Sequence, residues 1–312
     1  MRSFRLLVAG CLAPLMALAG TAAAQDRPTE PEATRVDDII VRGEPLHDQV
    51  GAFVDDVIEP PRGRGIARWS DRGGVCVGIV NLRPEAAQAM ADRVSEIADG
   101  VGLPIGEPGC SPNILIIATD DAGTLARGLV DRSPNAFRPD YAGAAGTVRD
   151  LRAFTESDRA VRWWHVMMPV HEDSGAPAVR LPGYENAPMI SRMAGRLSTP
   201  VRNVMMRAYV IVDVDQIEDL TFRQLSDYVA MVAFAQIDPD VDVANFGTIL
   251  NVVDDPTVAQ EMTEWDHAFL AALYGTELRQ SSPNAQAGAV AALMYRDRRR
   301  AAEDEAEAEA PE

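Results

Sequence analysis

The stretch from Arg207 to Ile237, RAYVIVDVDQIEDLTFRQLSDYVAMVAFAQI, decides the fold of this chain. Its first part, Tyr209 to Val214, is mostly β-branched and apolar, which is typical of a strand inside a sheet. Thr221 is followed three residues later by Gln224, a capping-box pattern in which each side chain satisfies a backbone N–H at a helix start. The helix that follows has almost no polar face, and such a helix packs inside a protein core. We therefore expect a buried strand that leads almost directly into a buried central helix.

Few positions of this central helix can take part in chemistry. Its polar residues are Gln224, Ser226, Asp227, Tyr228 and Gln236. None of them is a metal-binding histidine or a nucleophile recognisable together with its base. The stretch therefore indicates an architecture and does not reveal an enzymatic activity.

The apolar pattern on either side of this stretch predicts further strands and helices. Helical spacing begins at Leu46, and a proline starts the helix at Pro84. The expected strands are 75–82, 113–118 and 160–170, and the expected helices are 46–58, 84–98, 122–130, one capped by Thr263 and one beginning near Asn284. Residues 133–153 and 171–200 are expected to be irregular. The expected fold class is α+β, a mixed sheet with packed helices and a buried central helix, in one domain over residues 44–298.

The first residues have the layout of a secretory signal peptide. Arg2 and Arg5 precede an apolar run, and small residues, Ala22 and Ala24, stand before the expected cleavage site. We therefore expect residues 1–24 to be removed and the protein to be periplasmic or secreted. The rest of the chain has no apolar run of about 18 residues, so no stable membrane insertion is expected after cleavage.

Two features of the chain ends complete this organisation. Residues 8–11 read VAGC, so lipidation at Cys11 is an alternative to simple cleavage of the signal. Residues 25–43 are polar and contain proline, which predicts a disordered lead-in. Residues 299–312, which end in EDEAEAEAPE, are expected to form an acidic disordered tail.

The chain is strongly acidic, with 47 Asp and Glu residues, 29 basic residues and a formal net charge of −18. Loss of Arg2 and Arg5 with the signal would leave 27 basic residues and a charge of −20. Such a surface repels phosphate backbones, so we expect no nucleic-acid partner. No motif indicates a cofactor, and the partner class we expect is a protein or a peptide.

Two cysteines, Cys76 and Cys110, remain after removal of the signal. In an oxidising compartment a disulfide between them is the favoured interpretation. The alternative, a redox or metal-binding pair, lacks the C-x-x-C spacing. In the chain-entropy description, a disulfide that closes this loop contributes about 4 kcal/mol to stability.

Residues 160–172 contain the side chains most suited to a site. His165, His171 and Glu172 are the best local group for a metal, because imidazole and carboxylate together suit zinc. A metal site of this kind requires that the three side chains converge in space. Trp163 and Trp164 are adjacent on the expected strand and face opposite sides, so one should be buried. The other would mark a binding edge, to which a partner peptide adds as a further strand.

With this order of elements, the chain resembles an uncharacterised family of exported proteobacterial proteins. The resemblance covers most of residues 45–274 and implies no particular activity. The matching residues are the segments around Cys76 and Cys110, the helix Gln224 to Gln236, the segments TILN at 248–251 and TEWD at 263–266, and Leu273-Tyr274.

The element order is also distantly similar to that of zincin metallopeptidases, which place an active-site helix after an edge strand and a last strand. Zincin chemistry needs H-E-x-x-H, in which two histidines bind Zn²⁺ and the glutamate activates water. With Gln224 at the first histidine, these positions are Gln224, Leu225 and Tyr228, and the central helix has no histidine or glutamate. The similarity therefore implies a zincin-like scaffold without its reaction. The predicted function is an exported, non-catalytic binding or envelope-associated module; the alternative is an atypical, metallopeptidase-like hydrolase with a non-standard metal site.

Overall fold

One strand joins the rest of the sheet together in this computed structural model, which describes residues 45–58, 65–139, 146–179, 195 and 197–308. The strands are β1 Ala67–Arg68, β2 Val77–Val80, β3 Ile114–Thr119, β4 Val161–His171 and β5 Val201–Asp213. Along one edge β5 pairs in parallel with β3 and, nearer its start, with β1. The other edge of β5 pairs antiparallel with β4, and β2 pairs in parallel with β3. The mixed sheet that the sequence predicts is therefore confirmed.

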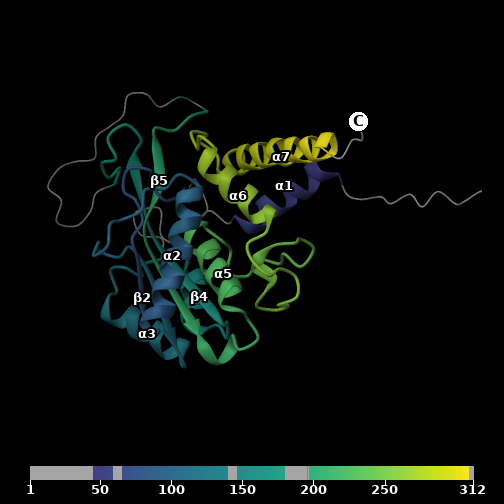
Figure 1. Cartoon of the computed structure of the whole chain (residues 1–312). Helices are drawn as coiled ribbons and strands as arrows, with labels where there is room; N and C mark the ends of the chain where they lie inside the picture. The colour runs from purple at the N-terminus through teal and green to yellow at the C-terminus, as the bar shows by residue number, and fades with distance from the viewer. Residues whose placement is uncertain (1–44, 59–64, 140–145, 180–194, 196, 309–312) are drawn as a thin grey trace, which may run out of the picture. The chain divides into compact units, whose positions relative to one another are not determined.

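Seven α-helices in the described part of the chain cover both faces of this sheet. They are α1 Leu46–Val57, α2 Pro84–Gly100, α3 Ala122–Arg132, α4 Val148–Glu156, α5 Phe222–Phe234, α6 Glu264–Gly275 and α7 Pro283–Ala308. Helices α2 and α5 lie on one face of the sheet, and α3 and α4 pack on the other. Helices α1, α6 and α7 pack together beside α5 (Figure 1). The core is largest on the α5 side, where it includes residues of all these helices except α3 and α4.

Helix α5 is the buried central helix, because every residue from Gln224 to Phe234 is buried. The predicted capping box is present: the Thr221 hydroxyl accepts from the Gln224 N–H, and the Gln224 side chain accepts from the Thr221 N–H. The Gln224 amide also donates to the carbonyl oxygens of Pro256 and Ala259, at 2.7 and 2.6 Å. Gln224 therefore joins the start of the central helix to the segment before α6.

A buried ion pair fixes α5 against α2. The carboxylate of Asp227 is fully buried and accepts two hydrogen bonds from the Arg93 guanidinium, at 2.6 and 3.1 Å. It also accepts the backbone N–H of Met262 at 2.6 Å. Hydrogen bonding to Asp227 is the main cause that raises the pKa of Arg93. A single carboxylate therefore connects two helices and the loop that precedes α6.

A β-bulge interrupts the long antiparallel pair. Val166 of β4 pairs with Arg207 of β5, but the next residue, Met167, pairs with Met205. Met206 is therefore the extra residue on β5, and it is exposed. Bulges increase the local twist and redirect neighbouring side chains.

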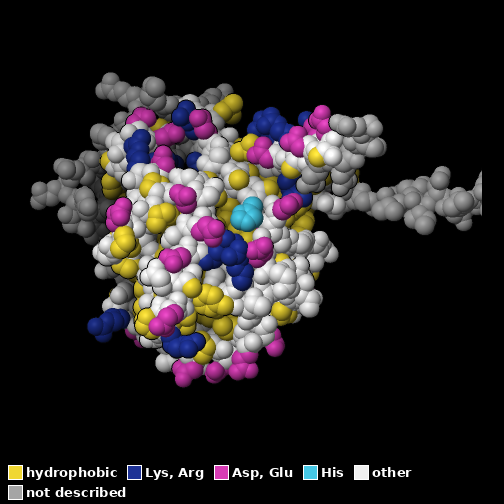
Figure 2. Space-filling model, in the orientation of Figure 1, with side chains coloured by type: hydrophobic (Ala, Val, Ile, Leu, Met, Phe, Trp, Pro, Cys, Tyr) yellow, Lys and Arg dark blue, Asp and Glu magenta, His cyan; other side chains and the backbone are white. Residues whose placement is uncertain are grey.

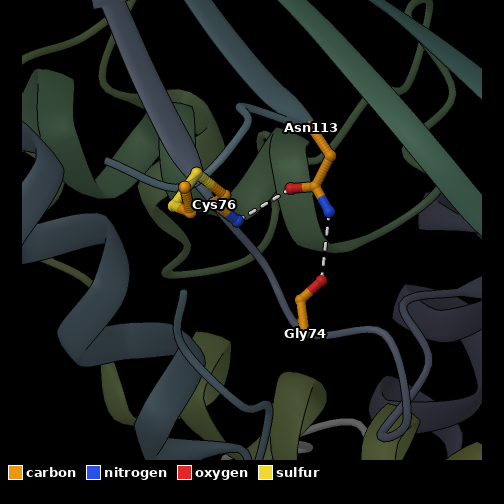
Figure 3. Close-up of a disulfide and its surroundings, with 4 residues drawn as sticks. Gly74, Cys76 and Asn113 are labelled. Atoms are coloured by element: carbon orange, nitrogen blue, oxygen red, sulfur yellow. Dashed lines mark hydrogen bonds between the residues drawn. A yellow bond between two sulfur atoms is a disulfide. The ribbon is translucent and has the colours of Figure 1, made fainter. Parts of the chain in front are cut away.

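The disulfide Cys76–Cys110 ties the start of β2 to the segment before β3 (Figure 3). The Asn113 side chain supports it by accepting the Cys76 N–H at 2.8 Å and donating to the Gly74 carbonyl at 3.1 Å. Gly106 packs directly against the bridge, because a Cβ at this position would lie 2.6 Å from the Cys110 sulfur. The predicted pairing of the two cysteines is present in the structure.

The structure corrects several sequence-based boundaries. The prediction that residues 133–153 are irregular is wrong at its end, because Thr147 and Asp150 form a capping box that starts α4. Strand β5 begins at Val201, well before the predicted strand. Helix α7 continues to Ala308, so residues 299–308 are helical instead of part of a disordered tail. The predicted signal peptide and lead-in lie outside the described residues.

Within the part of the chain that the structure describes, no helix combines the length and the apolar character needed to cross a membrane.

We expect Asp227→Ala to lower the free energy of unfolding by about 3–5 kcal/mol, because it leaves the largely buried Arg93 without its partner. Urea denaturation measures this loss. The matched control is Glu96→Gln, which removes the other carboxylate bound to Arg93, one whose side chain is 68% exposed. The control should cost less than about 1 kcal/mol. Equal losses in the two variants would show that the buried pair has no special role.

We expect a Cys76→Ser/Cys110→Ser double variant to lose up to about 4 kcal/mol of stability, because the unfolded chain regains the freedom of a loop with a sequence separation of 34 residues. The measurement is the urea midpoint of the oxidised protein, of the protein in dithiothreitol and of the variant. Reduction should shift the wild-type midpoint to that of the variant and leave the variant unchanged. A reductant effect of the same size on the double variant contradicts this assignment.

Candidate functional site

The structure does not bring the predicted metal ligands together. His165 and His171 are six residues apart on the extended strand β4, which separates them by about 20 Å at a rise of about 3.3 Å per residue. Zinc ligands lie only about 2.0–2.2 Å from the ion, so these two histidines cannot share one. Among the described residues, no group of three or more His, Cys, Asp or Glu side chains is arranged to hold a metal ion. The predicted site at His165, His171 and Glu172 is therefore wrong.

Each of these side chains has a different environment. His165 is buried against α5, and its Nε2 donates to the carbonyl oxygen of Val232 at 2.9 Å. Burial is the main cause that lowers the pKa of His165 to about 4. His171 is buried at the end of β4 beside Val201, and its Nε2 has no partner. Glu172 forms an ion pair with Arg279 at 3.1 Å.

The two tryptophans face opposite sides of the sheet as predicted, but both are buried, so the predicted exposed tryptophan at a binding edge is wrong. Trp163 packs edge-on against Tyr228, and its indole N–H donates to the Ile237 carbonyl at 3.2 Å. Trp164 packs with Phe137 on the α3 and α4 side. Trp163 borders the larger cleft described next, and both tryptophans line a small hollow beside it.

This cleft lies beside the start of β4 and has a volume of about 600 Å³. Its wall is built from segments that are distant in sequence: residues 158–161 and 163, residue 216, Tyr228 of α5, residues 237 and 239–244, and residues 250, 251, 253 and 254. The last segment includes part of the 3₁₀ helix η3 (Ile249–Asn251). Asp266 at the start of α6 holds η3 in place, because its buried carboxylate accepts the Ile249 N–H at 2.9 Å. The site is thus positioned by the core rather than by one local motif.

The floor of the cleft is apolar and its rim is acidic. The buried side chains that line it are Val161, Trp163, Tyr228, Ile237, Val243 and Leu250. Four aspartates lie at the rim, namely Asp158, Asp240, Asp242 and Asp254, and Arg159 is the only basic residue in the lining. Ligand sites commonly combine an apolar floor with a few placed polar groups.

The rim charge is only partly neutralised. Hydrogen bonds from Arg149 and Arg159 lower the pKa of Asp240, so this carboxylate is compensated. Asp158, Asp242 and Asp254 have no ion pair within the described structure. The acidic lining continues into an adjacent hollow that shares Asp240 and Asp242 with the cleft, and the described residues around this hollow include no basic side chain. Figure 2 shows acidic side chains also distributed over the face formed by α2 and α5, with arginines among them.

Two hydrogen-bond donors in the cleft are unoccupied. The Tyr228 hydroxyl has no hydrogen-bond partner among the described residues, and burial is the main cause that raises its pKa. The guanidinium of Arg159 uses Nη2 for Asp240, while its Nη1 is buried without a partner. Because Arg159 lowers and Asp254 raises the pKa of Tyr228, all three groups act on the same part of the cleft. These donors can bind carbonyl oxygens of a ligand.

The backbone of β4 also faces this cleft. Asp213 of β5 donates its N–H to the carbonyl of Ala160, so residue 160 belongs to a hydrogen-bonded antiparallel pair. In an antiparallel ladder, hydrogen-bonded and non-hydrogen-bonded pairs alternate. Val161 and Trp163 occupy non-hydrogen-bonded positions, so their backbone N–H and C=O groups point away from β5. Next to Trp163, a much smaller hollow of about 30 Å³ lies beside His165 and Met167. The open part of the β4 edge is therefore short and lies at Val161 to Trp163.

Sequence reasoning found only part of this site. It singled out Tyr228 among the polar positions of the central helix, and Trp163 as one of two strand tryptophans. It missed the rim. The alternation of aspartate in residues 238–242, DPDVD, is the one local signal for it, because three carboxylates at every second position cannot all enter a core. Gln224 and Asp227, two other polar residues of α5, have structural roles.

No family model matches the chain, and the curated proteins and solved structures that were searched contain no significant match.

We expect the buried His165 to make stability depend on pH. Its folded-state pKa of about 4 lies below the ordinary value of 6.5, so the unfolded chain takes up a proton first as the pH falls. This contribution to stability is therefore complete above about pH 6.5 and declines toward pH 4, with a loss of about 2 kcal/mol between pH 7 and pH 5.

The check is urea denaturation at pH 7 and pH 5 for wild type, His165→Gln and the exposed control His267→Gln. The glutamine amide at 165 retains a donor for the Val232 carbonyl but does not titrate. The stability lost between the two pH values should be smaller by about 2 kcal/mol in His165→Gln only. An unchanged difference in that variant contradicts the assignment.

Proposed function

We propose that this chain is an exported, non-catalytic binding module that holds an extended, basic peptide segment in the cleft beside β4. The observation that carries the proposal is the combination of an apolar floor with three rim carboxylates, Asp158, Asp242 and Asp254, that form no ion pair among the described residues. Export is inferred from the signal-like residues 1–24 and agrees with the disulfide, which persists in oxidising compartments.

An extended peptide suits this site for two reasons. Its backbone can pair with the open edge of β4 at Val161 to Trp163, which is the strand-addition mode of peptide recognition. A peptide carbonyl can also accept from the Tyr228 hydroxyl, which lines the cleft. Alternate side chains of an added strand point to opposite faces, so apolar residues would meet the floor and basic residues the rim.

The side chains in the cleft support binding rather than hydrolysis. Among the described residues, its lining contains no histidine, cysteine, serine or threonine, so a nucleophile paired with a histidine base is absent there. The hydrolase alternative depended on a metal held by His165, His171 and Glu172, which lie apart. The position of α5 beneath an edge strand agrees with the zincin-like scaffold that the element order implies, and that relationship remains a proposal.

The test is selection from a random peptide-display library on purified mature protein, followed by calorimetry with the selected peptides. We expect enrichment of peptides with arginine or lysine at alternate positions. Replacing Asp158, Asp242 and Asp254 together by Asn should weaken binding by about tenfold and reduce its dependence on salt, because rim charges each contribute modestly.

The matched control replaces three exposed aspartates outside the cleft, Asp55, Asp99 and Asp297, by Asn. This variant has the same net charge as the rim variant and should bind as the wild type does. Equal weakening of peptide binding in both variants would show that only the overall charge matters. Selection of neutral or acidic peptides would contradict the proposal.

A further inference from the structure

A second hollow, of about 460 Å³, lies on the opposite face of the sheet. Its floor is the surface of β4 and β5 at Val166, Arg207 and Tyr209, and its wall is the turn that follows α3. Among the described residues, the lining consists of Arg132, Ser133, Pro134, Asn135, Ala136, Val166, Arg207 and Tyr209. It shares no residue with the acidic cleft, so the two sites are separate.

The wall of this hollow is held firmly. The turn is closed by the Ala136 N–H, which donates to the Ser133 carbonyl at 2.8 Å. The Ala136 carbonyl in turn accepts the indole N–H of Trp164 at 2.8 Å. The next residue, Phe137, is buried with its ring 5.0 Å from that of Tyr209. The backbone of the turn is therefore anchored to the sheet that forms the floor, and it needs little ordering when a ligand binds.

The charge of the hollow is opposite to that of the chain as a whole. The formal net charge is −18, yet this lining contains two arginines and no acidic residue. Neither Arg132 nor Arg207 has a hydrogen bond or an ion pair within the described structure. Arg207 stands next to the bulged residue Met206, on the same face as Tyr209. Two unpaired arginines without a neighbouring carboxylate among the described lining residues favour the binding of an anion.

The uncharged groups of the lining add further donors. Among the described residues, the side chains of Ser133, Asn135 and Tyr209 make no hydrogen bonds, and each can donate one. Together with two guanidinium groups they exceed what a carboxylate, with two oxygens, can accept. A phosphate group offers three or four acceptor oxygens and matches the planar arginine fork. Val166 and Pro134 provide apolar contact for the part of a ligand that carries the phosphate.

We propose that this hollow is a phosphate-binding site, in which Arg132 and Arg207 bind the phosphate group of a small soluble molecule or of a lipid headgroup. The site goes beyond the proposed peptide cleft and does not depend on it.

The first measurement is calorimetric titration of the mature protein with inorganic phosphate, at low and at physiological ionic strength. We expect saturable binding that weakens with salt, because the contacts are charged and partly exposed. Arg132→Gln and Arg207→Gln should each weaken it by about tenfold or more, since each removes a charge-assisted interaction. The control Arg152→Gln removes one charge from an exposed residue of α4 outside the hollow, and should bind phosphate as the wild type does.

A second arm distinguishes the sources of the phosphate. Flotation with phosphatidylglycerol vesicles that depends on Arg207, with phosphatidylcholine vesicles as the blank, assigns the site to a lipid headgroup. Phosphate binding without flotation assigns it to a soluble molecule. The proposal is overturned if neither probe binds, or if Arg152→Gln weakens binding as much as Arg207→Gln. Urea midpoints of all variants check that folding is retained, and peptide binding in the acidic cleft should be unchanged in Arg207→Gln.

Discussion

Burial of α5 on every side is the constraint on which the rest of the structure depends. A helix without a solvent face needs a partner for each polar group that it carries. Gln224 and Asp227 meet this need by bonding to the segment before α6 and to α2, and in doing so they fix the positions of those elements. Tyr228 is the exception, because its hydroxyl remains unpartnered at the cleft. The central helix therefore meets solvent where the candidate site is.

The two candidate sites differ in how they use the sheet. The acidic cleft lies at the edge of β4 and is completed by loops that follow α5, so its shape depends on several distant segments. The basic hollow lies on the broad surface of β4 and β5, beneath one short turn.

Much of the architecture was predictable because its signals are local. The capping boxes at Thr221 and Thr263 and the apolar run of β5 identify elements within a few residues. The same kind of signal, Thr147 with Asp150, was present for α4 but was obscured by the proline and glycine residues before it. The cleft was not predictable, because its lining comes from five segments that are adjacent only after folding. The metal site predicted at His165 and His171 was wrong for a related reason, because residues six positions apart on an extended strand lie far apart in space.

The pairing of β5 on both edges has a consequence for how fast the protein folds. β5 follows every other strand in the sequence, and its register joins Asn203 to Ala67 and Ala208 to Ile114. These contacts join residues that are far apart in the sequence. They slow folding, because a long loop must close before the hydrogen bonds of β5 can form. Before β5 joins the sheet, β2 and β3 are the only described strands that can pair with each other, and the disulfide lies within this β2–α2–β3 unit. The early product of folding is therefore a small, covalently closed βαβ unit, which presents the bare edge of β3 to the strand that arrives last.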